Sequence, residues 1–419
     1  MKITQLAPIG AMTAIAATLG LTGTPANATE GYFAPGYSPN QRAVAGAGVA
    51  NPSDAMSATI NPAGAARVGR QMQMGLEFFS PNRGYDATGT GFVPPGSVTS
   101  GEKLFPVPNF AYNMPLDNGA VLNFSVYGNG GMNTTYPAGL PGCGSVFCGG
   151  PAGVDLAQLF LSATYANTAG NMSYGIAPTL VAQRFSATGL GAFVGSSVDG
   201  SALTNNGNDW SFGYGLRAGV QFELSETLRF GLAGQTKMYM SEFDKYAGLF
   251  ADGGDFDVPA SITAGFAWDA RPDLTLMLDY KRIFYSGVGA VGNATDAGLF
   301  GAPGGAGFGW DDVNVIKIGG EWRASDTMTW RAGYGYSSNP VGPEDVTINI
   351  LAPGIVKHHF SFGGSRRLND RDSLDFAVIY VPENTVSGPE VTPGGVTPGS
   401  NIDLRMNQFS VSVGWTRQF

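Results

Sequence analysis

The chain has 419 residues, of which 43% are apolar and only 13% charged, and its net charge is −9. This composition excludes a charge-rich disordered chain, and the acidic balance excludes the basic surface that nucleic acid requires. Glycine and proline make up about one residue in five, which argues against long helices, and no interior stretch offers the roughly 20 apolar residues of a membrane-spanning helix.

The first 28 residues have the pattern of a secretory signal peptide. Lys2 gives a positive start, an apolar run extends from Leu6 to Leu21, and Ala26-Asn27-Ala28 matches a small-residue cleavage site. A membrane anchor is the alternative, but the apolar run is short and rich in Ala, Thr and Gly. Residues 1–28 are therefore predicted to direct export and to be removed.

Residues 29–70 are rich in Ala, Gly and Pro and lack strand periodicity. Ser53 is expected to cap one short helix over residues 54–58. Asn61-Pro62 is expected to end it, because a residue before proline is disfavoured in the helical region. A disordered tail is the alternative, but the few charges favour a small folded segment that plugs the barrel predicted below.

From about residue 71 the dominant sequence period is two. In the last segment the apolar Phe409, Val411 and Val413 alternate with Ser410 and Ser412, as in a strand with one apolar and one polar face. The predicted strands are 71–79, 105–114, 119–128, 156–166, 172–187, 210–224, 228–239, 259–268, 274–285, 311–323, 327–336, 358–368, 374–380 and 405–419.

The connections between these segments alternate between tight turns and long loops. Residues 116–119, 224–226 and 324–326 are short and rich in turn-forming residues. An even strand number, short turns at one end and long loops at the other describe an outer-membrane barrel, whereas a propeller would not give alternating loop lengths. Residues 71–419 are therefore predicted to be all-β: a fourteen-stranded antiparallel transmembrane β-barrel.

The last strand ends in Phe419. This residue resembles the C-terminal aromatic signal of outer-membrane barrels, so we expect the barrel-assembly machinery and outer-membrane lipid as partners. A barrel of fourteen strands is too wide for side chains alone to fill its lumen, which calls for a plug or leaves a pore.

Three motifs in residues 29–70 resemble the N-terminal hatch of the FadL family: Gln41 to Gly46, Asp54-Ala55, and Asn61-Pro62-Ala63-Gly64. These proteins are outer-membrane transporters of long-chain fatty acids and other hydrophobic compounds, TodX-type aromatic hydrocarbon channels included. The family often has an aromatic residue before Asn-Pro-Ala, and here it is Ile60. The resemblance implies that Asn61, Pro62 and Ala63 are a hatch element that must move for passage.

The run from Tyr127 to Asn133 also resembles the family, whose members kink this strand to make a side opening. Gly128, Asn129, Gly130 and Gly131 are the implied opening, because glycine adopts conformations that break strand pairing. An ordinary loop start is the alternative.

An apolar group in the loop 241–256 is the candidate capture surface for a ligand. Phe243, Tyr246, Leu249 and Phe250 recur at helical spacing, and Phe193 lies in the preceding long loop. We expect an exposed patch that binds the ligand; the alternative is that these groups pack the loops together.

Basic residues are predicted to line the lumen, where they either meet a fatty-acid carboxylate or pair with acidic residues of the wall. The basic residues are Arg217, Lys237, Lys281, Lys317 and Arg331, and the acidic ones are Glu77, Glu223, Asp279 and Glu321.

Cys143 and Cys148 suit a small loop-closing disulfide in an exported protein. The only histidines are His358 and His359, so the sequence predicts no metal site and no cofactor. We expect a monomeric transporter of long-chain fatty acids in the outer membrane of a Gram-negative bacterium, with aromatic hydrocarbons as the alternative cargo. A water-filled porin, or a lipase using a serine with a histidine (His359 facing the lumen), is the alternative of another class.

Overall fold

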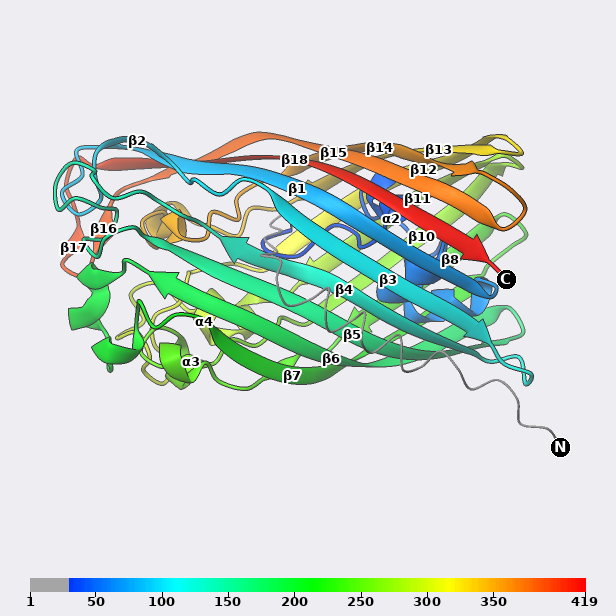
Figure 1. Ribbon diagram of the computed structural model, residues 1–419, viewed down its shortest axis with the longest axis horizontal. Helices are drawn as coiled ribbons and strands as arrows, with labels where there is room; N and C mark the ends of the chain where they lie inside the picture. Colours follow the sequence, from blue (N-terminus) through cyan, green and yellow to red (C-terminus); the bar gives the residue numbers. More distant parts are fainter. Residues whose placement is uncertain (1–29) are drawn as a thin grey trace.

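The computed structural model describes residues 30–419, so the predicted signal peptide lies outside the described residues. None of the helices in this range is long and apolar enough to cross a membrane. The dominant feature is a single barrel wall of long tilted strands (Figure 1).

Fourteen antiparallel strands form the wall, and each pairs with its neighbours in chain order. The last strand pairs with the first along their whole lengths, from Gln71–Gln418 to Thr88–Asn401, which closes the barrel. The wall strands are β1 (Gln71–Thr88), β3 (Phe105–Pro115), β4 (Val121–Asn133), β5 (Gly153–Ala169), β6 (Met172–Thr188), β7 (Asp209–Glu223), β8 (Leu228–Gln235), β10 (Ser261–Arg271), β11 (Leu274–Ile283), β12 (Val313–Ser325), β13 (Met328–Ser337), β14 (His358–Arg367), β15 (Asp372–Gly388) and β18 (Asn401–Gln418).

The alternation along the strands gives the wall an apolar outside and a polar inside. On β7 the outward Phe212 and Tyr214 are 63% and 66% exposed, whereas the inward Ser211 is buried. This is the reverse of a soluble barrel and is typical of one that faces lipid. The predicted fourteen-stranded antiparallel barrel is therefore confirmed.

Two predicted strands end eight or nine residues too early. The segments predicted as 71–79 and 374–380 extend to Thr88 and Gly388. Both extensions pair with β18, which runs beside them. The pairing, rather than their own periodicity, keeps these residues extended.

The long connections carry short elements at the end of the barrel opposite the C-terminus (Figure 1). They are β2 (Gly96–Thr99), β9 (Tyr239–Met240), β16 (Val391–Thr392), β17 (Gly395–Val396), α3 (Ala251–Gly254), α4 (Gly289–Gly292), η3 (Gly191–Ser196), η4 (Gly200–Ala202), η5 (Asp244–Tyr246), η6 (Tyr285–Gly287), η7 (Pro343–Asp345) and η8 (Ile348–Ile350). Three further short helices belong to residues 30–70: α2 (Pro39–Ala43), η1 (Ala55–Thr59) and η2 (Pro62–Arg67). We call residues 30–68, which lie inside the barrel, the hatch.

Candidate functional site

The hatch is built from short turns, each started by a polar side chain. Asp54 accepts a hydrogen bond from the Met56 amide and begins η1, so the prediction that Ser53 caps this helix is wrong. Asn61 accepts from the Ala63 amide and begins η2, with Pro62 in its first turn. Asn61-Pro62 thus ends one turn and starts another, because proline needs no amide donor in the first turn of a helix.

The Asn61-Pro62-Ala63 motif rests directly on the wall. Asn61 Nδ2 donates to the carbonyl oxygens of Val49 in the hatch at 2.7 Å and of Val220 on β7 at 3.1 Å. The backbone of Pro62 and Ala63 lies against Gly175 on β6, where any side chain would overlap it. These contacts hold the motif in one position against two strands.

Buried ion pairs join the hatch to the wall. Glu30 lies between the ammonium groups of Lys281 and Lys317, at 2.7 and 2.6 Å. Arg42 contacts Glu77 at 2.7 Å, with both side chains almost fully buried. Burial alone would raise the pKa of Glu30, but the two ammonium groups outweigh it and lower the pKa to about 2. Glu30 is therefore charged throughout the physiological range.

The predicted pairing of wall bases with wall acids holds only in part. Arg331 contacts Glu321 at 2.7 Å, as expected. The other predicted wall acids instead meet the hatch: Glu77 binds Arg42, Glu223 binds Arg67, and Asp279 accepts from the amides of Gly48 and Val49. Lys237 contacts Asp257 in a long connection. The sequence did not predict that these wall acids pair with the hatch, because the two-residue period identifies inward-facing wall positions but says nothing about which hatch residues lie beside them.

Strand β4 is irregular at Gly128–Gly131, the four residues that the family resemblance implies as the side opening. Its pairing with β5 shifts register between Gly128 and Gly131. The hatch fills this break: Phe33 bridges Gly130, and the Ala34 amide donates to the Asn129 carbonyl at 2.9 Å. A side chain at Gly130 would overlap the Tyr32 carbonyl. The break therefore brings the wall and the start of the hatch together.

The seam between β3 and β4 is also interrupted here. Pairing between these strands stops at Asn109–Tyr127, although β3 continues along β1 to Phe105. Pro106 and Pro108 lie in the part of β3 that pairs with β1 but not with β4, and they have no amide hydrogen to donate. The two prolines are a sequence signal that could have predicted this interruption, but the strand prediction above did not use it.

A cavity of about 40 Å³ lies between the hatch and the wall beside this region. Phe33, Tyr37 and Ile60 line it from the hatch, and Arg217, Lys281 and Lys317 line it from the wall. Arg217 is 7% exposed and donates to Tyr127 Oη at 2.5 Å and to the Thr59 carbonyl, but it pairs with no carboxylate of residues 30–419. Three cations thus face the cavity; Glu30 pairs with the two lysines, and Asp279 lies opposite Lys317 in the strand register.

The apolar residues predicted as an exposed capture patch are buried. Phe243 and Tyr246 are fully buried, and Leu249 and Phe250 nearly so. They form no continuous helix; Phe243, Tyr246 and Phe250 pack around Phe185 of β6. The expectation of an exposed patch is therefore wrong for these residues, because neighbouring aromatic groups bury them in the core of the loop region.

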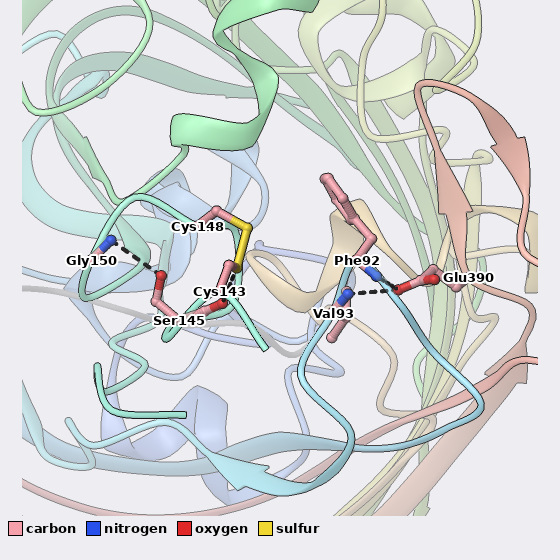
Figure 2. Close-up of a disulfide and its surroundings, with 7 residues drawn as sticks. All are labelled: Phe92, Val93, Cys143, Ser145, Cys148, Gly150 and Glu390. Carbon is pink, nitrogen blue, oxygen red and sulfur yellow. Dashed lines mark hydrogen bonds between the residues drawn. A yellow bond between two sulfur atoms is a disulfide. The ribbon is translucent and has the colours of Figure 1, made fainter. Parts of the chain in front are cut away.

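Phe193 belongs to a second aromatic group, which joins the long connections to one another. It packs against Phe92, Phe147 and Phe300 at centroid distances of 5.0–5.5 Å. Phe147 belongs to residues 143–148, the small loop that the Cys143–Cys148 disulfide closes. Figure 2 shows this disulfide. We call Phe92, Phe147, Phe193 and Phe300 the aromatic cap.

Glu390 anchors the segment that carries Phe92. Its carboxylate accepts from the amides of Gly91, Phe92 and Val93 at 2.6–2.9 Å. Figure 2 shows the contacts with Phe92 and Val93. Connections from distant parts of the sequence are therefore tied together over one end of the barrel.

No group of three or more metal-ligating side chains occurs within residues 30–419. His359 is buried on the inner side of β14, as predicted, while His358 is exposed and bonds to Tyr334 Oη at 2.8 Å. The two histidines thus lie on opposite sides of one strand.

Comparisons with known proteins agree with this geometry. The sequence profile of the family described as outer membrane protein transport protein (OMPP1/FadL/TodX) matches residues 34–414. A comparison with curated proteins gave no significant match.

Solved barrels of this kind resemble the chain over nearly its whole length. The toluene transporter TodX of Pseudomonas putida is 17% identical with a TM-score of 0.67, covering 92% of this chain and 99% of its own. A FadL homologue of Pseudomonas aeruginosa is 16% identical with a TM-score of 0.67, covering 93% and 100%. The toluene transporter TbuX of Ralstonia pickettii is 17% identical with a TM-score of 0.64, covering 92% and 99%.

Proposed function

The chain belongs to the OMPP1/FadL/TodX family of outer membrane transport proteins, and from this premise we propose which compound it carries and by what route. It is an outer-membrane protein of a Gram-negative bacterium, and its family transports hydrophobic compounds. Its cargo, in this proposal, is a long-chain fatty acid.

The positive cavity is the observation that carries this proposal. Arg217, Lys281 and Lys317 face it; Glu30 pairs with the two lysines, whereas Arg217 pairs with no carboxylate of residues 30–419. A buried cation without a counter-ion is costly, and a fatty-acid carboxylate supplies the missing negative charge. The aromatic groups beside the cavity, such as Phe33 and Tyr37, suit the alkyl chain.

The proposed route begins at the loops and ends at the break in β4. Phe193, Phe243, Tyr246, Leu249 and Phe250 are buried, so we propose that they separate to admit the ligand rather than offer it a ready surface. The ligand then passes the hatch at Asn61-Pro62-Ala63. It leaves sideways through the wall at Gly128, Asn129, Gly130 and Gly131, where the β3–β4 pairing has already stopped.

Aromatic hydrocarbons are the second candidate cargo. Tyr32, Phe33, Phe256, Tyr285 and Trp310 form a continuous group of ring contacts inside the protein, and TodX and TbuX are described as toluene transporters. A neutral hydrocarbon would use these rings and leave the positive cavity without a role.

The substitution Arg217→Met separates the two candidates. It removes the cation that has no carboxylate partner, and a lost charged hydrogen bond of ~2 kcal/mol weakens oleate binding roughly 30-fold. Toluene binding should stay unchanged. Arg331→Met is the matched control, because Arg331 is equally buried but already pairs with Glu321.

Binding to the purified protein, with labelled oleate and toluene, is the measurement. Equal losses for both ligands, or no loss for oleate, would remove the carboxylate from the proposal. Because the hatch lies in the lumen, we expect the reconstituted protein to conduct few ions. A large steady ion conductance would favour the water-filled porin instead.

A further inference from the structure

Two glutamines form a directly opposed pair on the inner side of β5 and β6. Gln158 lies opposite Gln183 in the strand register, and both side chains are buried. Gln158 Oε1 accepts from Asn129 Nδ2 at 3.4 Å, and Gln183 Nε2 donates to the Phe256 carbonyl at 3.2 Å. Gln158 Nε2 and Gln183 Oε1 have no hydrogen-bond partner among the described residues. The pair thus leaves one donor and one acceptor unused.

The hydroxyl group of Tyr32 adds a third unused polar atom. Its ring packs against Tyr285, Trp310 and Phe256 at centroid distances of 5.2–6.2 Å. The hydroxyl interacts with the Gln158 side chain, but no hydrogen bond of ordinary geometry joins it to residues 30–419. An unpaired polar group buried among rings costs about 1–3 kcal/mol, so these three atoms call for a partner.

The position of Gln158 connects these atoms to the break in β4. Its neighbours Leu159 and Ala157 pair with Gly128 and Gly131, so Gln158 stands opposite the two residues that leave the ladder. Tyr37 of the hatch donates to Asn129 Oδ1 at 2.9 Å, and Asn129 in turn donates to Gln158. A polar track therefore runs from the hatch through the break to the glutamine pair.

We propose that Gln158, Gln183 and Tyr32 form a hydrogen-bonding site for an uncharged polar group, a hydroxyl or carbonyl, of the hydrophobic substrate as it reaches the break in β4. This inference rests on the proposed transport function and extends its substrate class to long-chain compounds that carry an uncharged polar group. A plain hydrocarbon leaves all three atoms unpaired, whereas an oxygenated one satisfies them. A site built to hydrogen-bond its ligand rejects the analogue that lacks the polar group.

Uptake of tetradecanol and of tetradecane tests the site, because the two compounds differ by one hydroxyl and neither is charged. Cells that express the protein are compared with cells that do not. The wild type should favour the alcohol. Gln158→Met, Gln183→Met and Tyr32→Phe should each lower the alcohol-to-alkane uptake ratio roughly fivefold, the effect of one lost hydrogen bond, without lowering alkane uptake.

Gln73→Met is the matched control. Gln73 is a buried glutamine of β1 whose amide atoms also lack partners among the described residues, but it pairs with Thr416 and Ala111, away from the break. Its substitution should leave the ratio unchanged. Gln158→Asn keeps an amide and should retain part of the preference, which separates loss of the hydrogen bond from loss of folding.

The outcomes separate failure of the proposed transport function from failure of the glutamine site. If the wild type does not import labelled oleate, the proposed function fails; if it imports oleate but neither tetradecanol nor tetradecane, the glutamine site is wrong. If it imports tetradecanol and tetradecane and the three variants keep the wild-type ratio, or if Gln73→Met changes the ratio equally, the glutamine site is wrong and bound water satisfies these atoms.

Discussion

The substitution Glu30→Gln tests how firmly the hatch is seated. It removes the charge from a buried carboxylate that lies 2.7 Å from Lys281 Nζ and 2.6 Å from Lys317 Nζ. The glutamine keeps the shape of the side chain but removes the carboxylate that contacts both buried ammonium groups. We therefore expect the start of the hatch to separate more often from the wall.

The pKa of Glu30 sets the size of this effect. Burial opposes the charge, but the two lysines lower the pKa from 4.5 to about 2, and this difference corresponds to about 3 kcal/mol. Breaking a buried ion pair costs a similar amount, about 3–5 kcal/mol. Because the pKa is lower in the folded state, this stabilisation is present above pH ~4.5 and is lost as the pH falls towards 2.

Hydrogen exchange of the Ala34 and Gly131 amides is the assay. These amides donate to Asn129 and Tyr32 across the junction of hatch and wall. A loss of ~3 kcal/mol speeds their exchange roughly 150-fold, and acid should reproduce this in the wild type but not in the variant. Asp86→Asn is the control, because it breaks the Arg405–Asp86 pair away from the hatch. Unchanged exchange in Glu30→Gln would refute the reasoning.

Two further predictions concern Asp54 and the disulfide. Burial raises the pKa of Asp54 to about 6, so its ionisation destabilises the seated hatch as the pH rises from about 4 to 6. Asp54→Asn should keep the helix cap and abolish this pH dependence, whereas Asp54→Ala should lose the cap at a cost of about 1 kcal/mol. Hydrogen exchange of the Met56 amide measures both effects. Cys148→Ser should destabilise the aromatic cap by about 2 kcal/mol. Proteolysis within residues 140–150 should become faster while the thermal unfolding temperature of the barrel stays unchanged. Equal proteolysis rates in the variant and the wild type would contradict a role for the disulfide.

The barrel could be predicted from the sequence because each wall strand faces lipid on one side and a polar lumen on the other. That pattern is local, so it gives the number of strands and most of their bounds. It fails for the outer parts of β1 and β15, which contain Pro81 and Pro382 and are kept extended by β18. Here tertiary pairing decides the structure.

The site could be predicted only where a residue type carried the signal. The glycines from Gly128 to Gly131 mark the break in β4, and Asn61-Pro62-Ala63 marks the hatch. No local signal pointed to Glu30 as the partner of Lys281 and Lys317, because the contact joins the hatch to strands β11 and β12, about 250 or more residues away in the sequence. Burial of Phe243 and Phe250 likewise depends on Phe185, which belongs to another segment.

A reversible disulfide across the β3–β4 seam tests the central claim, lateral release through the wall, most directly. A Cβ atom placed at Gly128 lies 3.0 Å from Val107 Cγ1, which suits a disulfide in the double variant Val107→Cys/Gly128→Cys. The account predicts that uptake of labelled oleate stops in the oxidised variant and returns after reduction, while the wild type responds to neither treatment in this way. Equal uptake by the oxidised and reduced variant would contradict it.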